Sequence, residues 1–353
     1  MRALGILRGF PGLGRVVSAT AILETLRDNY SWDIEMISYL QGQIFLQNRG
    51  YSVAPCVTKM DYCSIGLLPT SQMGKYIHQR INDYNPDVII IDGEPLMLHS
   101  IRISYPHIII VTLLNPSDVD NPQNDKEAMD FFNSMYRQAN LAIVHGLRRV
   151  NAFNGYNQYL SIGTILRDEI IQARNIPSGN IYCILGGGTV NVGSEFAETT
   201  IRIARLCMEA ASLMQDYVIH IICSSDNILG EILDDTPENV RIHNSIMDST
   251  LYYSNASLII TRSGRNTLSE LVYLGIPAIS FVSGDAYRMD EQRNNIQSIN
   301  APNIFAMDTN QSASTLALLC KKAICQGEVQ SHFEVGNEKA IKSILALCDD
   351  VDK

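Results

Sequence analysis

The sequence predicts an α/β protein built from two doubly wound, Rossmann-like domains that face each other across a cleft. Apolar runs of strand length, such as residues 88–91 and 108–111, alternate with helical patterns along the chain. A glycine-rich turn follows the first strand of each half, at residues 9–15 and 186–189. With 353 residues, the chain is long enough for each of two domains to bury a core of its own.

The first half is expected to contain parallel strands separated by helices. Strands are predicted at residues 3–8, 86–92, 107–114 and 141–145, and helices at 17–26, 71–84 and 126–139. Residues 41–70 show no clear period, and we interpret them as strand fragments and a loop. The pattern restarts after Gly163, so we expect an N-terminal domain over residues 1–163 and a C-terminal domain over residues 164–353.

The second half repeats the same alternation of strands and helices. Strands are predicted at residues 181–185, 218–223, 240–243 and 258–260, and a long helix at 195–213. A closing helix at residues 337–347 is a candidate to pack back on the N-terminal domain.

Charge and hydropathy argue against several kinds of partner. The chain has 27 Lys and Arg against 37 Asp and Glu, a formal charge of -10, which argues against binding to nucleic acid. The apolar runs are far shorter than a membrane span and the first residues lack a signal-peptide core, so we expect a soluble, cytoplasmic protein. A local basic or apolar patch leaves peripheral membrane contact open.

The cysteines and histidines show no metal-binding spacing. Eight cysteines occur without a Cys-x-x-Cys pair, and we interpret them as free, mostly buried thiols of a reducing compartment. Seven histidines lack the i, i+4 spacing of a helical metal site. The sequence therefore predicts no metal site.

Residues 258–281 carry the strongest local signal of a binding site. An apolar strand is followed by Gly264, whose backbone freedom suits a sharp turn, and then by a short helix that ends at Gly275. The backbone amides at the start of that helix, with Arg262 and Arg265 beside them, suit a phosphate or a diphosphate.

Glu270 lies one to two turns into the same helix. Its carboxylate is placed to accept hydrogen bonds from two sugar hydroxyls once the phosphates are bound. The spacing of Thr267 and Glu270 also matches a capping box. The alternative is therefore that these residues only cap the helix, while Arg262 pairs with an acid elsewhere.

Two carboxylates follow the predicted strand at residues 86–92. Asp92 and Glu94 flank a glycine at the carboxyl end of that strand, which is the edge where open parallel sheets bind ligands. The alternative is that they cap the helix that follows Pro95.

Several motifs occur together along the chain. The best match is Ile-Thr-Arg-Ser-Gly at residues 260–264, followed by Thr267, Glu270, Asp285, Glu291 and Gln292. Weaker matches are the opening glycine turn and residues 92–95, 162–167 and 186–189. This string resembles the GT-B-type nucleotide-sugar glycosyltransferases, nearest to the MurG-like group that contains the lipid II N-acetylglucosaminyltransferase. The resemblance implies the GT-B architecture, with an acceptor-binding first domain and a donor-binding second domain.

For the second domain, the resemblance implies a site for a nucleotide-sugar donor. Ile246 would contact the base, Glu270 the ribose hydroxyls and residues 264–267 the diphosphate. Glu291 and Gln292 would contact hydroxyls of the transferred sugar. The complete set of expected donor-binding residues is Gly187, Gly188, Thr189, Ile246, Arg262, Ser263, Gly264, Arg265, Asn266, Thr267, Glu270, Asp285, Glu291 and Gln292.

For the first domain, the resemblance implies an acceptor or phosphate loop at Gly12, Leu13 and Gly14. The family usually has a histidine after this turn, a candidate for acid-base work, where this chain has Arg15. A guanidinium cannot act as a base, but it can bind a phosphate or a developing negative charge. We therefore predict that Glu94, or failing that Asp92, acts as the base, and that Arg15 is the third catalytic residue.

The predicted reaction transfers a sugar from a nucleotide diphosphate donor, expected to be a UDP-sugar, to a hydroxyl or amine acceptor. The resemblance implies inversion at the anomeric carbon. Helix and arginine charges would replace a metal, so we expect no cofactor beyond the co-substrate. The acceptor, either a small molecule or a lipid-linked one, stays open. The alternatives are a nucleotide-sugar hydrolase or epimerase on the same fold, and a non-catalytic nucleotide-sugar binding subunit.

Overall fold

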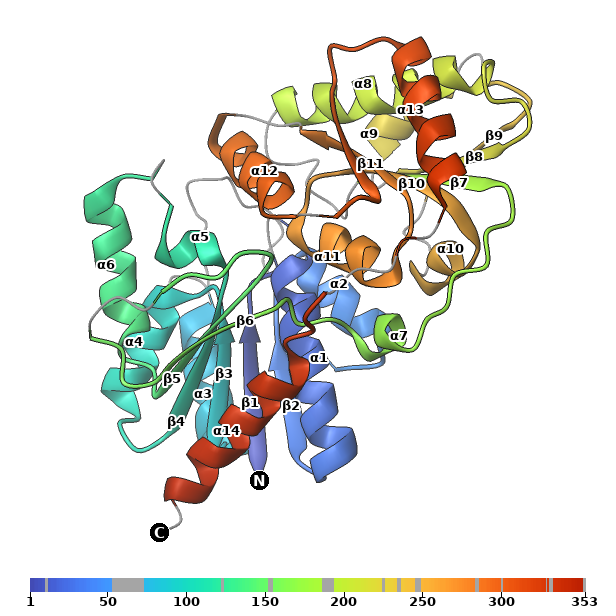
Figure 1. Cartoon of the computed structure of the whole chain (residues 1–353). Helices are drawn as coiled ribbons and strands as arrows, with labels where there is room; N and C mark the ends of the chain where they lie inside the picture. Colours follow the sequence, from blue (N-terminus) through green and yellow to red (C-terminus); the bar gives the residue numbers. More distant parts are fainter. Residues whose placement is uncertain are drawn as a thin grey trace. The chain divides into compact units, whose positions relative to one another are not determined.

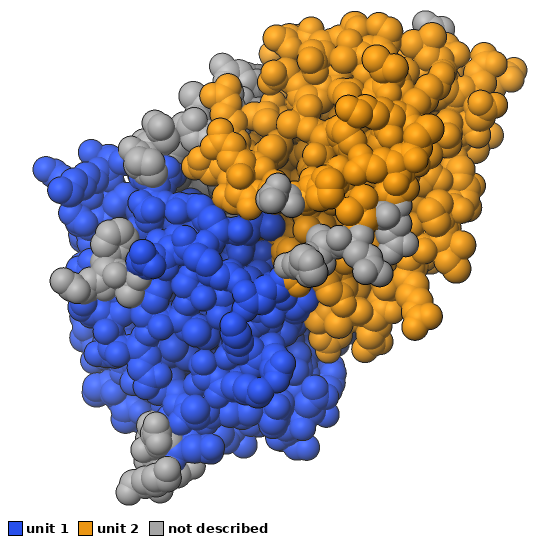
Figure 2. All heavy atoms as spheres, in the orientation of Figure 1, with its two compact units in different colours: residues 1–167, 334–353 blue, residues 168–333 orange. Residues whose placement is uncertain are grey.

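The chain leaves its first unit after Arg167 and returns to it at Glu334. Unit 1 comprises residues 1–167 and 334–353, and unit 2 comprises residues 168–333 (Figure 2). Unit 2 is therefore an insertion within unit 1, and the closing helix belongs to unit 1. The computed structural model describes residues 1–9, 12–52, 73–121, 124–151, 155–185, 194–223, 226–233, 236–244, 249–282, 286–299, 301–327, 329 and 333–351.

Unit 1 is built on a six-stranded parallel sheet in the order β2-β1-β3-β4-β5-β6 (Figure 1). Its strands are β1 (Arg2–Leu7), β2 (Asp33–Ile37), β3 (Val88–Asp92), β4 (Ile109–Leu114), β5 (Leu141–His145) and β6 (Tyr159–Ile162). Every residue of β3 and β4 is buried, which explains why these central strands read as uninterrupted apolar runs.

Helices flank this sheet: α1 (Gly14–Tyr30), α2 (Gln41–Asn48), α3 (Gly74–Tyr84), α4 (Pro95–Ser104), α5 (Pro116–Val119), α6 (Lys126–Tyr136) and α14 (Asn337–Val351). The prediction of strand fragments and a loop over residues 41–70 is wrong at its start, where α2 forms. Only Gly42 and Leu46 of α2 are buried, and one buried pair is too short a period to reveal a helix. Residues 53–72 lie outside the described part of the chain.

Helix α14 completes the core of unit 1. Its residues Ala340, Ile341 and Ile344 belong to the same buried cluster as Ile22 of α1 and Ile143 of β5. The returning segment therefore covers apolar surface that would otherwise meet water.

The two segments that connect unit 1 with unit 2 pass each other in direct backbone contact inside unit 1. A Cβ on Gly163 would lie 1.7 Å from the carbonyl oxygen of Glu334, and a Cβ on Gly336 would lie 2.2 Å from the carbonyl oxygen of Gly163. No other residue type fits either position without moving the backbone. We call this contact, formed by residues 163–166 and 334–337, the crossing clamp.

Hydrogen bonds close the crossing clamp. The amide of Gly336 donates to the carbonyl of Thr164 at 3.0 Å. The side chain of Asn337 pairs with the backbone of Leu166, donating from Nδ2 to the carbonyl at 2.7 Å and accepting from the amide at 2.9 Å. The outgoing and returning segments are thus fixed to one another.

Unit 2 is built on a second parallel sheet, in the order β12-β11-β10-β7-β8-β9 (Figure 1). Its strands are β7 (Asn180–Ile184), β8 (Val218–Ile222), β9 (Val240–His243), β10 (Ala256–Arg262), β11 (Ala278–Val282) and β12 (Ile304–Asp308). Its helices are α7 (Asp168–Ile171), α8 (Ser194–Ala211), α9 (Asp226–Gly230), α10 (Ser249–Asn255), α11 (Arg265–Leu274), α12 (Ala286–Ser298) and α13 (Ala313–Gln326).

The core of unit 2 contains several of the cysteines. All six described cysteines are free thiols, and Cys325 is exposed while the other five are buried. Cys183 of β7, Cys207 of α8 and Cys320 of α13 belong to one buried cluster. The prediction of free, mostly buried thiols is confirmed for these six, and Cys56 and Cys63 lie outside the described residues.

Both sheets reverse their strand order, between β1 and β3 in unit 1 and between β7 and β10 in unit 2. The prediction of two doubly wound parallel sheets is confirmed. In such sheets, ligands bind beyond the carboxyl ends of the strands that flank the reversal point. Within the described ranges, no helix has the length and apolar character that a bilayer span requires.

Candidate functional site

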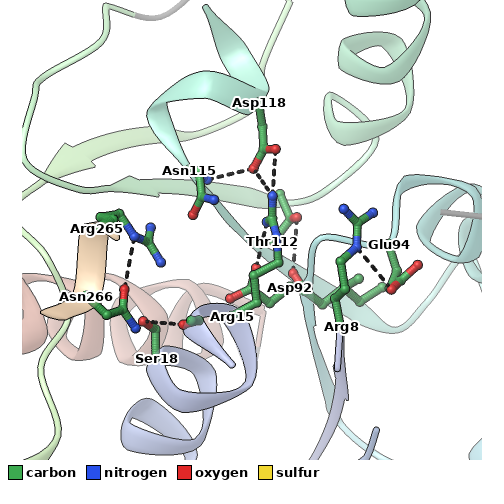
Figure 3. A network of polar contacts seen from close by, with 12 residues as sticks. Arg8, Arg15, Ser18, Asp92, Glu94, Thr112, Asn115, Asp118, Arg265 and Asn266 are labelled. Carbon is green, nitrogen blue, oxygen red and sulfur yellow. Dashed lines mark hydrogen bonds and ion pairs between the residues drawn. The ribbon is translucent and has the colours of Figure 1, made fainter. Parts of the chain in front are cut away.

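Five charged side chains gather at the carboxyl edge of the unit 1 sheet (Figure 3). We call them the unit 1 ion cluster: Arg8, Arg15, Asp92, Glu94 and Asp118. Arg8 follows β1, Asp92 ends β3, Glu94 follows β3, Asp118 lies in α5 after β4, and Arg15 lies in the first turn of α1. Parallel strands bring these segments together because their carboxyl ends meet at one edge.

Arg15 connects two of the three carboxylates. Its NH1 donates to Asp92 Oδ1 at 2.9 Å, and its NH2 donates to both oxygens of Asp118 at 2.6 and 2.8 Å. Burial alone would raise the pKa of Asp118, but Arg15 holds that pKa below its ordinary value. The guanidinium is thus a permanent cation that binds two carboxylates, and its predicted role at a phosphate stays a prediction.

Gly93 allows this arrangement. Its φ is +80°, and a Cβ there would lie 2.6 Å from Cδ of Arg15. A larger residue would therefore be strained and would displace the arginine.

Glu94 is fully buried and is held through one of its oxygens. Oε1 accepts hydrogen bonds from Nε of Arg8 at 3.3 Å and from the hydroxyl of Tyr39. Burial raises the pKa of Glu94, although Arg8 and Tyr39 act in the opposite direction. A raised pKa makes a carboxylate a stronger proton acceptor than an exposed glutamate.

The alternative that Glu94 merely caps a helix is wrong. Glu94 occupies the N-cap position of α4, but its side chain makes no capping hydrogen bond. The next residue, Pro95, has no amide hydrogen to offer. Arg8 and Tyr39 hold the carboxylate instead.

Sequence reasoning missed three members of this site, namely Arg8, Tyr39 and Asp118. Each follows the end of a strand in the unit 1 sheet, and that position is the signal that identifies them. The predicted order of strand, turn and helix is confirmed, but α1 begins at Gly14, with Leu13 as its N-cap, and so starts before the predicted residue 17. The loop role of Gly12, Leu13 and Gly14 stays a prediction.

In unit 2, the turn between β10 and α11 differs from the expected capping box. The N-cap of α11 is Gly264, which makes no side-chain cap, and the helix starts at Arg265. Glu270 lies in the second turn, too far in to cap, and its Oε2 accepts from the hydroxyl of Tyr253 at 2.8 Å. The capping interpretation of Thr267 and Glu270 is therefore wrong, whereas the predicted helix end at Gly275, with φ of 69°, is confirmed.

Hydrogen bonds from neighbouring elements hold the turn between β10 and α11 in place. Ser263 is buried, and its hydroxyl lies 2.9 Å from the hydroxyl of Ser280 and 2.9 Å from the carbonyl of Phe281. Asn295 of α12 donates to the carbonyl of Ser263 at 3.1 Å. The side chain of Ser263 therefore fixes the turn to the sheet, which is a structural role.

The position that a side chain on Gly264 would occupy is open. A Cβ on Gly264 would meet no described heavy atom within 4 Å, and its backbone is ordinary extended chain with φ of -72°. Neither packing nor strain requires glycine there. Arg262 and Arg265 are about nine-tenths buried, and Nε of Arg265 donates to Asn266 Oδ1 at 3.1 Å.

The remaining expected donor residues are only partly described. Gln292 lies in α12 and is 7% exposed. Glu291 lies in the same helix, but its side chain is outside the described part. Gly187, Gly188, Thr189, Ile246 and Asp285 also lie outside the described residues. The described residues include no group of three or more His, Cys, Asp or Glu suited to a metal ion, and metal independence stays a prediction.

Solved structures share the fold of the whole chain. Acinetobacter baumannii MurG matches with a TM-score of 0.58 at 14% identity, covering 98% of this chain and 100% of that chain. The glycosyltransferase VinC in complex with dTDP matches with a TM-score of 0.57 at 12% identity, covering 99% and 100%. The Methanocaldococcus jannaschii UDP-GlcNAc 2-epimerase in complex with UDP-GlcNAc and UDP matches with a TM-score of 0.64 at 12% identity, covering 98% and 99%.

These likenesses establish the fold, which transferases and an epimerase share. No curated protein sequence matches the chain. Residues 189–323 match the family description "Glycosyltransferase family 28 C-terminal domain". The whole chain has the fold of GT-B-type glycosyltransferases, and residues 189–323 match a glycosyltransferase family domain. The resemblance to the MurG-like group, predicted from the motifs, is thereby supported by the fold of the whole chain and by the sequence of residues 189–323.

Proposed function

We propose that the protein is a glycosyltransferase in which unit 2 binds a nucleotide diphosphate sugar, with a uridine nucleotide as the expected form, and unit 1 binds the acceptor. The observation that carries the proposal is the open turn at Gly264, which lies at the carboxyl end of β10, beside the reversal point of the unit 2 sheet. It also lies within the matched family domain. Solved proteins of the same fold carry dTDP or UDP-GlcNAc and UDP, which supports a nucleotide-sugar donor.

The diphosphate is assigned to the start of α11. The first amides of a helix point along its axis toward an anion, and the helix dipole adds to this attraction. Arg262 and Arg265 stand on either side of the turn in the sequence and supply positive charge. The space over Gly264 lets phosphate oxygens approach the backbone.

The ribose is assigned to Glu270. Tyr253 binds one oxygen of this carboxylate at 2.8 Å and so fixes its orientation. Because Glu270 is only 5% exposed, little water has to leave its carboxylate when the two ribose hydroxyls donate hydrogen bonds to it.

In this proposal, the transfer is a single displacement with inversion at the anomeric carbon. The acceptor oxygen or nitrogen forms a bond to the anomeric carbon while the bond from that carbon to the diphosphate oxygen breaks. The breaking bond's electron pair goes to the diphosphate, whose charge the α11 amides and the arginines stabilise. The acceptor proton goes to Glu94, which later releases it to water. No metal takes part in this scheme.

Binding of UDP tests the donor site. Calorimetric titration of Glu270→Gln is expected to give an affinity about tenfold below wild type, because a charged hydrogen-bond acceptor is lost. Glu231→Gln, at an exposed ion pair with Arg205 in the same unit, is the control and should bind UDP as wild type does. Undiminished binding by Glu270→Gln would remove the basis of the proposal.

Incubation with UDP-sugars in the absence of acceptor separates the alternatives. Stoichiometric release of free sugar would favour a hydrolase, and interconversion of two UDP-sugars would favour an epimerase. An intact donor that is consumed only when an acceptor is added supports transfer. A protein that binds UDP and turns over with no acceptor would be a binding subunit.

A further inference from the structure

The contacts of Glu94 divide its two oxygens into one that is held and one that is not. Oε1 accepts from Nε of Arg8 at 3.3 Å and from the hydroxyl of Tyr39. Oε2 is buried and has no hydrogen-bond partner among the residues that the structure describes. A buried acceptor without a partner costs free energy, which a bound ligand with a hydrogen to donate recovers. We call Arg8, Tyr39 and Glu94 the carboxylate cradle.

We propose that Arg8 and Tyr39 are positioning residues, which confine proton transfer to Oε2 of Glu94 and present that oxygen to the nucleophilic hydroxyl or amine of the acceptor. The inference rests on the proposed function, in which Glu94 takes the acceptor proton. Neither Arg8 nor Tyr39 touches a substrate in this scheme, so both act through Glu94.

The donors around Oε1 decide which oxygen carries the proton. A guanidinium can only donate, and Tyr39 donates to the same atom, so a proton on Oε1 would face two donor hydrogens. Oε2 faces none in the described structure. The proton of the acceptor's O–H or N–H bond therefore moves to Oε2. The electron pair that stays on the acceptor oxygen or nitrogen forms the new bond to the anomeric carbon.

The charges around Glu94 favour an acceptor whose reacting group arrives neutral, or as an ammonium that loses a proton before it attacks. The unit 1 ion cluster contains three carboxylates and two guanidiniums, and Arg15 is already bound to two of the carboxylates. With Glu94 ionised, the cluster carries one excess negative charge. An acceptor that offers a hydroxyl or an ammonium-forming amine suits this charge, whereas a nucleophile next to a phosphate or carboxylate does not.

Four ionisable groups interact electrostatically with Glu94. Arg8 after β1 and Arg15 in α1 carry positive charge, and Tyr39 after β2 and Tyr136 in α6 are buried phenols. Burial raises the pKa of Glu94, and Arg8 and Tyr39 both oppose that rise. Removal of either partner is therefore expected to raise this pKa further.

The free protein provides the first test, because it needs no substrate. The carboxyl carbon of Glu94 is followed against pH by NMR of isotope-labelled protein, with Glu94→Gln identifying its signal. We expect Tyr39→Phe and Arg8→Gln each to move this titration to higher pH, and Arg8→Gln to move it further because a charge is lost. The controls are Tyr159→Phe and Arg80→Gln, which remove a hydroxyl and an ion pair elsewhere in unit 1 and should leave the titration in place.

Kinetics provide the second test. Tyr39→Phe is expected to lose about tenfold in kcat/KM at acidic pH and to recover at alkaline pH, where Glu94 is ionised in both proteins. Arg8→Lys, which keeps the charge, should retain most of the activity that Arg8→Gln loses at acidic pH. A loss by the same factor at every pH would mean a merely structural role and would overturn the proposal.

The two tests separate this inference from the function on which it rests. Sugar transfer with a Glu94 titration that neither Tyr39→Phe nor Arg8→Gln moves overturns the inference alone. A titration that moves as expected in a protein that transfers no sugar overturns the proposed function, and the assignment of an acceptor to Oε2 falls with it. Circular dichroism and Tm confirm folding, and Arg8→Lys with Tyr39→Phe carries the test if Arg8→Gln does not fold.

Discussion

The carboxyl edges of the two sheets differ in the space that they leave for a ligand. In unit 1, Arg15 binds two carboxylates and Arg8 binds a third, so both cations already have anionic partners. In unit 2, Arg262 and Arg265 flank a turn above which no described heavy atom would touch a Cβ on Gly264. The unit 1 edge is filled by its own ion pairs, whereas the unit 2 edge leaves space next to the backbone of Gly264.

This difference shows how two similar sheets come to serve different chemistry. A paired network holds its members in place and shifts the proton affinity of a carboxylate within it. An open helix start flanked by cations suits an anion that arrives from solution. This difference is the reason for proposing that unit 1 transfers the proton and that unit 2 binds the leaving diphosphate.

The largest expected effect tests whether the unit 1 edge is a buried network. Arg15→Met leaves Asp92 and Asp118 without their shared arginine and should lower the free energy of unfolding by about 3 to 5 kcal/mol. Arg205→Met, at the exposed pair with Glu231, should cost about 0 to 1 kcal/mol. Urea unfolding measures both, and equal losses would contradict the description of the unit 1 edge as a buried ion network.

The next effect is on catalysis. Glu94→Gln keeps the shape of the side chain but cannot take up a proton, so kcat should fall by about 100-fold or more. The affinity for UDP should stay at the wild-type value, because UDP is assigned to the other unit. Glu24→Gln, at the ion pair with Arg49 on unit 1, is the control. Full activity in Glu94→Gln would shift the role of base to Asp92.

A smaller effect tests the open edge of unit 2. Gly264→Val adds atoms in empty space, so Tm should not change, but affinity for UDP should fall about tenfold because the added methyl groups displace the phosphates. Gly230→Val in α9 also adds atoms where no described heavy atom lies within 4 Å, and it should affect neither quantity. Unchanged UDP affinity in Gly264→Val would place the nucleotide elsewhere.

The smallest effect is the pH dependence of stability within unit 1. Asp118 has a pKa below its ordinary value of 3.8, so its contribution to stability is present above that value and is lost as the pH falls through the lower folded pKa. Glu94 has a pKa above its ordinary value of 4.5, so its contribution is present below that value and is lost as the pH rises through the higher folded pKa.

The two substitutions should therefore show opposite trends. From pH 4.5 upward, the stability of Glu94→Gln should rise relative to wild type. As the pH falls below 3.8, the deficit of Asp118→Asn should shrink. Chemical unfolding at a series of pH values measures both differences, and parallel trends would show that the two carboxyls occupy similar environments.

Much of the fold could be predicted because buried parallel strands are runs of apolar residues. The predicted strands at Leu141–His145 and Val240–His243 coincide with β5 and β9. The strand β2 was missed because its sequence, Asp-Ile-Glu-Met-Ile, places two carboxylates among five residues and gives only a short alternation. Helix α2 was missed because so little of it faces the core.

The candidate site could be predicted only where its signal is local. Asp92 and Glu94 follow a strand that is plain in the sequence, so their place at the sheet edge could be inferred. Their partners Arg8, Tyr39 and Asp118 come from other strand ends, and which strands are neighbours depends on the order of the whole sheet. No local sequence pattern shows which residues from different strand ends will contact one another.

The crossing clamp has a practical consequence for dissecting the enzyme. Because residues 163–166 and 334–337 are hydrogen-bonded to each other, the two ends of unit 2 leave unit 1 from neighbouring positions. We therefore expect that a short glycine-serine linker could replace residues 168–333. The shortened polypeptide would retain the first sheet, α14 and the carboxylate cradle. Acceptors can then be screened against it with no sugar nucleotide present, and a broad, non-cooperative urea transition would show that the excision had failed.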